Sequence, residues 1–113
     1  MSLRIAIHSI TALAFDPDAI AEALMETCNR RSLRYNLRGV CPVDDKVFFL
    51  LEPRAASAPS EQYVIVPVSD TTEDGVTGML NERWGAGFGA IGTVPLGEDT
   101  CLFVFAKPMD PAR

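Results

Sequence analysis

The sequence predicts an α+β domain in which two strand–helix–strand–strand repeats form a mainly antiparallel six-stranded sheet with both helices on one face, as in relatives of the ferredoxin-like fold. Two helical stripes are each preceded by one apolar strand and followed by two more. A Pro-, Ala- and Ser-rich stretch separates the two sets. The halves also share landmarks, because Gly39 and Phe48 in the first half align with Gly92 and Phe103 in the second.

The first repeat has clear start signals for its helix. The expected elements are a strand (4–10) with Ile5 and Ile7 on one face, a helix (16–31), a strand (34–41), a turn (44–45) and a strand (47–51). Asp16 can cap the helix and Pro17 suits its first turn. Ile20, Leu24 and Cys28 then follow at four-residue spacing, which predicts one apolar stripe along the helix.

The second repeat follows the same order. The expected elements are a strand (63–68), a helix (70–84), a strand (87–94), a turn (97–99) and a strand (101–106). Asp70 and Glu73 resemble a capping box at the helix start. Val76, Leu80 and Trp84 continue at four-residue spacing and predict the buried stripe. We therefore expect one domain over residues 1–113, with repeats at 4–53 and 61–108.

Composition excludes several classes of partner. The 113 residues carry ten basic and fifteen acidic side chains, for a net charge of −5. Nucleic-acid and anionic-membrane binders need a clustered positive field, so neither partner is expected. Three cysteines without a close pair favour reduced thiols in the cytoplasm. With one histidine in the chain, we expect no metal site and no cofactor.

The two wholly apolar strands predict a partner for the sheet. Residues 47–51 and 101–106 carry large apolar side chains on both faces, and two helices on one side can cover only one of them. We therefore expect a homodimer through the helix-free sheet face. Closure of the sheet on itself and a bound apolar ligand are the alternatives.

Four residues are candidates for ligand binding, and no residue is assigned a catalytic role. Arg34 and Arg38 have even spacing on a strand, so they could share a face and grip a carboxylate or phosphate, and a solvated basic face is the alternative. His8 lies on the first strand, where a hydrogen-bonded structural histidine is the alternative. Trp84 ends a helix beside glycines and either lines a pocket or anchors the core.

One segment of the second half resembles a known family. Residues 80–88, Leu-Asn-Glu-Arg-Trp-Gly-Ala-Gly-Phe, are followed by Ile91-Gly92 and an apolar strand. This segment resembles a family of small bacterial domains of unknown function with a Leu-Asn, Gly, Gly-Trp pattern between a helix and a strand pair. Phe88 replaces the usual Trp and Gly89 a common acidic residue. The resemblance implies a strand–helix–strand–strand unit and carries no chemistry with it.

These observations predict a small, non-enzymatic binding, regulatory or interaction module that acts as a homodimer and could take a small anionic or apolar ligand. A small hydrolase or isomerase with a cleft near His8 or Cys41 is one alternative. A carrier of an apolar ligand is another.

Overall fold

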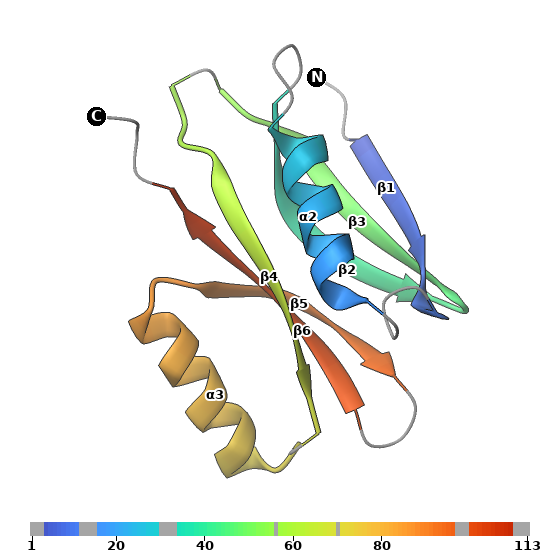
Figure 1. The fold of residues 1–113 in the computed structure, drawn as a ribbon, viewed down its shortest axis with the longest axis vertical. Coiled ribbons are helices and arrows are strands. Elements are labelled where there is room, and N and C mark those ends of the chain that lie inside the picture. Colours follow the sequence, from blue (N-terminus) through green and yellow to red (C-terminus); the bar gives the residue numbers. More distant parts are fainter. Residues whose placement is uncertain are drawn as a thin grey trace.

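The computed structural model describes residues 4–11, 16–29, 34–55, 57–69, 71–96 and 100–109. Its elements are β1 (Arg4–Ser9), α2 (Pro17–Cys28), β2 (Tyr35–Val43), β3 (Lys46–Pro53), β4 (Glu61–Val68), α3 (Glu73–Gly85), β5 (Gly89–Leu96) and β6 (Thr100–Pro108). Each half contributes one helix and three strands (Figure 1). The α+β class and the repeated β-α-β-β unit are therefore confirmed.

The prediction of a single six-stranded sheet is wrong. The strands form two separate antiparallel sheets of three, with orders β1-β3-β2 and β4-β6-β5. The edge strands β2 and β5 nevertheless pack together: a Cβ on Gly92 would lie 3.0 Å from the Cβ of Val40 and 3.6 Å from its backbone nitrogen. The two sheets therefore meet by packing where the sequence suggested a hydrogen-bonded ladder.

A β-bulge interrupts the second strand of each unit. The register of β2 shifts between Leu37 and Gly39, and that of β5 shifts between Ala90 and Gly92. In both strands a glycine follows the extra residue. Bulges bend a strand and increase its twist, so each sheet curves at the place where β2 and β5 approach each other.

The inner faces of both sheets share one hydrophobic core. It combines one face of α2 with inward side chains of both sheets: Ile20, Ala21, Leu24, Cys28, Leu37, Val47, Phe49, Leu51, Tyr63, Ile65, Val94, Leu102, Val104 and Ala106. The helical stripe predicted for α2 is confirmed, since Ile20, Leu24 and Cys28 are all buried. Figure 1 shows α2 lying near β4, a strand of the other repeat.

The prediction that both helices lie on one face of the sheet is wrong. α2 packs with Leu102 and Val104 of β6, whereas α3 packs over Phe103 and Phe105, which alternate with them on the opposite face. Because β6 is apolar on both faces, either face could accept a helix. Strand β6 is thus buried on both sides within one chain.

The helix starts agree with the sequence in one case and differ in the other. Asp16 caps α2 by accepting a hydrogen bond from the Ala19 nitrogen at 3.0 Å. The cap of α3 is Thr72, whose hydroxyl accepts from the Gly75 nitrogen at 3.1 Å, in place of the expected Asp70. α2 ends at Cys28, with Asn29 as its C-cap, so the end predicted near residue 31 is wrong. Asp70 and the turn at 97–99 lie outside the described residues.

Candidate functional site

One face of the sheet β1-β3-β2 carries large apolar side chains, and no helix of the described part of the chain lies over it. We call it the open face and define it by Ile5, Ile7, Cys41, Val43, Phe48 and Leu50. The strand register places these side chains together, because Ile5 pairs with Leu50, and Ile7 and Cys41 both pair with Phe48. Ile5 is 50% exposed and Ile7 is 53% exposed. Exposed apolar clusters of this kind mark interaction surfaces in soluble proteins.

The corresponding face of the second sheet is covered. Phe103 and Phe105 of β6 occupy the places of Phe48 and Leu50 in β3, and they pack against Val76, Met79 and Leu80 of α3. Phe105 is fully buried as a result, whereas Phe48 and Leu50 are only partly buried. The two units therefore carry similar apolar faces. A helix covers one of them, and among the described residues no helix covers the other.

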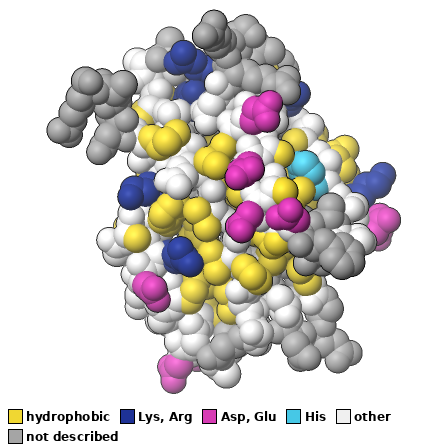
Figure 2. All heavy atoms as spheres, viewed as in Figure 1, with side chains coloured by type: hydrophobic (Ala, Val, Ile, Leu, Met, Phe, Trp, Pro, Cys, Tyr) yellow, Lys and Arg dark blue, Asp and Glu magenta, His cyan; other side chains and the backbone are white. Residues whose placement is uncertain are grey.

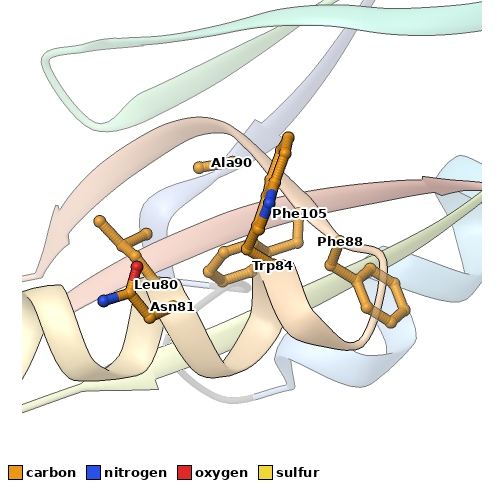
Figure 3. A pocket seen from close by; sticks show the side chains of 6 residues that line it. All are labelled: Leu80, Asn81, Trp84, Phe88, Ala90 and Phe105. Carbon is orange, nitrogen blue, oxygen red and sulfur yellow. The ribbon is translucent and has the colours of Figure 1, made fainter.

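A shallow groove lies beside α3. It has a volume of about 390 Å³ and is lined by Leu80, Asn81, Trp84, Phe88, Ala90 and Phe105. Figure 3 shows Leu80, Asn81 and Trp84 on α3, Phe88 just after the helix, and Ala90 on β5. The Trp84 indole lies close to Gly89: a Cβ added to this glycine would lie 3.7 Å from Cζ3 of the ring. At 74% exposure Trp84 lines this groove and does not anchor the core.

A polar network ties the two units together at the start of β4. The buried Tyr63 hydroxyl accepts a hydrogen bond from the Leu37 nitrogen at 2.8 Å and donates to Glu61 Oε1 at 2.9 Å. Burial raises the pKa of Tyr63 far above its usual value. Burial likewise raises the pKa of the Cys28 thiol, while a side-chain hydrogen bond with Tyr63 lowers it by a smaller amount. Both side chains are therefore neutral at ordinary pH, and we assign them a structural role.

The two predicted arginines differ in their surroundings. Arg38 is the extra residue of the β2 bulge and forms ion pairs with Glu52 at 3.8 Å and Glu61 at 3.4 Å. Arg34 precedes β2 in an isolated bridge with Asn29. The bulge breaks the alternation from which a shared face is predicted. Anion binding by this pair stays a prediction.

His8 and Trp84 do not form one pocket with each other. His8 lies on the inner face of β1, half-buried, with its ring 5.4 Å from that of Phe49 in an edge-on arrangement. Burial lowers its pKa. Figure 1 places β1 and α3 at opposite sides of the molecule. Cys41 is exposed on the open face rather than beside His8, so the two residues do not supply a common cleft.

Charge is unevenly distributed over the surface. Asp18, Glu22 and Glu26 are exposed along α2, and Figure 2 shows acidic side chains gathered over this helix. Basic side chains are spread over several parts of the same view. Arg4 is the first residue of β1 and Arg54 directly follows the end of β3. Neither arginine stands out in the sequence, because each is isolated in the chain. Strand pairing places Arg54 beside Arg34, whose backbone oxygen accepts a hydrogen bond from the Arg54 nitrogen at 2.9 Å.

The sequence predicts Ile5 and Ile7 on one face of a strand but does not indicate that this face is exposed. The signal that could have identified them is the similarity of the two repeats, since their counterparts on β4 are Val64 and Val66. Only the position of α3 distinguishes the two faces. That position depends on tertiary packing and is not visible in either strand.

No family model, curated protein or solved structure matches this chain. The resemblance of residues 80–92 to small bacterial domains therefore stays a prediction. Within the described ranges, no group of three or more His, Cys, Asp or Glu side chains is arranged to hold a metal ion. None of the helices described is long and apolar enough to cross a membrane.

Proposed function

We propose that this chain is a small interaction module, not an enzyme, and that it assembles as a homodimer through the open face. The observation that carries the proposal is the contrast between Phe48 and Phe103. These residues occupy equivalent places in the two units, yet α3 covers only Phe103. Full burial of one large apolar side chain contributes about 1.5–3 kcal/mol, so covering the open face is favourable.

The charges at the two ends of β3 favour a second copy of the chain as the partner that covers the open face. Lys46 and Glu52 lie on the same side of β3 as Phe48, at opposite ends of the strand, and both are exposed. Within the chain Glu52 forms the longer of the two Arg38 ion pairs, at 3.8 Å, and the other carboxylate that pairs with Arg38 is Glu61. A two-fold axis that sets the two β3 strands antiparallel brings Lys46 of each copy near the partner's Glu52. The apolar centre meets itself in the same arrangement, as a closed two-fold interface requires.

The size of the open face predicts a dimer of moderate strength. Three strands at about 4.8 Å spacing, with about six residues each at about 3.3 Å, give a flat area of roughly 300 Å². Stable complexes bury about 800 Å² per partner. We therefore expect a dimer that dissociates on dilution.

Sedimentation of the full chain over a range of micromolar concentrations tests the proposal. We expect the mass to rise from 12.3 kDa toward twice that value. Ile7→Lys should keep the chain monomeric and folded, because Ile7 is half exposed in the single chain. Thr77→Lys, on the exposed side of α3, is the matched control and should not change the mass. A wild-type chain that stays monomeric throughout contradicts the proposal.

A charge exchange tests the orientation. Lys46→Glu should weaken the dimer, and adding Glu52→Lys in the same chain should restore it, because opposite charges then meet again across the two-fold axis. Circular dichroism of each variant checks the fold. If the double variant is weaker than Lys46→Glu alone, the strands are not antiparallel across the interface.

A further inference from the structure

We infer that the groove beside α3 binds a small aromatic carboxylate, with the ring of the ligand against Trp84 and its charge on Lys107. The groove exists because one cross-strand row of the second sheet ends in a small residue. Val64 and Ala90 both pair with Phe105, so the three side chains share the outer face of this sheet. Only a methyl group therefore occupies the β5 end of the row, and the Trp84 indole forms a wall of the space that remains (Figure 3).

The lining of the groove suits a flat ring. Trp84 belongs to α3, Phe88 to the connection that follows this helix, and Phe105 to β6, so three parts of the fold each supply an aromatic side chain. Aromatic rings attract one another in offset or edge-on arrangements. Trp84 is 74% exposed, which leaves most of its indole available to a ligand. The volume of about 390 Å³ lies within the range of about 300–1,000 Å³ that is usual for small-molecule sites.

Lys107 places a positive charge at the Phe88 end of the groove. It follows Phe105 by two residues on β6, so the two side chains share the outer face. The stem of Lys107 packs against Gly87, where a Cβ would lie 3.1 Å from Lys107 Cε. Its Nζ lies 5.5 Å from the centre of the Phe88 ring. Both ion pairs among the described residues belong to Arg38, so Lys107 has no carboxylate partner there.

The charge and the polar groups favour an acid over a neutral ring or an amine. An amine would be repelled by Lys107, and a neutral ring would leave its ammonium group unpaired. On α3 the adjacent Glu82 and Arg83 carry opposite charges, so Lys107 decides the sign of the charge at this end. The Asn81 amide and the Trp84 indole N–H form no hydrogen bond within the described part of the chain. Both groups can therefore donate to carboxylate oxygens.

The indole N–H of Trp84 reports binding directly. The chain contains one tryptophan, so this group gives a single indole signal in the NMR spectrum of the full chain. Benzoate is the probe, at constant ionic strength. Benzyl alcohol lacks its charge and cyclohexanecarboxylate lacks its aromatic ring. We expect a saturable shift with benzoate and an affinity at least about threefold lower for each of the two controls.

Two variants separate the charge from the groove. Lys107→Gln should weaken benzoate binding by about three- to fivefold, as for the loss of an exposed ion pair, and should not change the affinity for benzyl alcohol. Arg4→Gln, on the first sheet, is its matched control. Ala90→Leu fills the groove and should abolish both shifts, whereas Thr93→Leu, on the same exposed face of β5, should not. Circular dichroism checks the fold of each variant.

Three results would overturn the inference. One is the absence of a saturable shift with benzoate. Another is equal affinity for benzoate and either control compound, since the charge or the ring would then not be recognised. The third is equal weakening by Lys107→Gln and Arg4→Gln, which would indicate a general charge effect. The groove and the open face belong to different sheets, so Ile7→Lys should bind benzoate as the wild type does, whatever its effect on the dimer.

Discussion

The contact between β2 and β5 depends on the missing side chain of Gly92. A Cβ at this position would lie 3.0 Å from the Cβ and 3.3 Å from the Cγ2 of Val40. The Cβ of Val40 is bonded directly to the backbone, so it cannot turn away as the end of a long side chain could. We expect Gly92→Ala to push the two edge strands apart.

The magnitude follows from two opposing effects. Replacing Gly by Ala restricts the unfolded chain, which alone stabilises a protein by about 0.4–1 kcal/mol. Overpacking of a closely packed region costs about 1–3 kcal/mol. The steric cost exceeds the entropic gain at Gly92, so we expect a net destabilisation of about 1–2 kcal/mol. At Gly78, which has nothing within 4 Å of its Cβ position, only the gain operates. Gly78→Ala should therefore stabilise the chain by about 0.5–1 kcal/mol.

Equilibrium unfolding in urea measures both variants against the wild type. The same chemical change should move the free energy of unfolding in opposite directions at the two glycines. A shift of about 1 kcal/mol corresponds to roughly 4 °C in Tm for a domain of this length, so thermal unfolding provides a second measurement. If Gly92→Ala is as stable as the wild type, β2 and β5 are not in contact and the sheets are joined differently.

Three other side chains give separate tests. Tyr63→Phe leaves the buried Leu37 nitrogen without its acceptor and should lower the free energy of unfolding by about 1–3 kcal/mol in urea; an unchanged value would contradict the network. Because burial lowers the pKa of His8 below its usual 6.5, the unfolded chain binds this proton more readily than the folded one. Stability should therefore fall as the pH drops below about 6.5, and His8→Gln should remove this component, as unfolding curves at several pH values would show. Trp84 is the only tryptophan, so its fluorescence should have the emission of a solvated indole and be quenched by acrylamide, whereas a blue-shifted, protected emission would place α3 differently.

The elements of the fold could be predicted because their signals are local. The cap at Asp16, the stripe of Ile20, Leu24 and Cys28, and the apolar strands all depend on neighbours within a few residues. The arrangement of these elements could not be predicted as well. A strand such as β6, apolar on both faces, does not indicate which face takes a helix. β2 and β5 pack together without forming a ladder, and each contains a bulge that is not evident from composition.

The candidate sites show the same division. The exposure of Trp84 could not be predicted, because its spacing continues the stripe that packs on β6 while its position at the helix end leaves it outside. Arg34 and Arg38 looked similar in the sequence. Ion pairs from Glu52 and Glu61 separate them in the structure, and these partners come from other strands. Pairing across strands therefore decides which charges remain available.

The different positions of the two helices limit how copies of this chain can assemble. α2 fills the shared core between the sheets, while α3 covers the outer face of the second sheet. A chain with both outer faces uncovered would carry two apolar surfaces and could assemble into an open-ended polymer. With α3 in place, the described part of the chain has one such face, the open face. A single self-complementary face closes on one partner, so the break in symmetry between the repeats favours a dimer over a fibre.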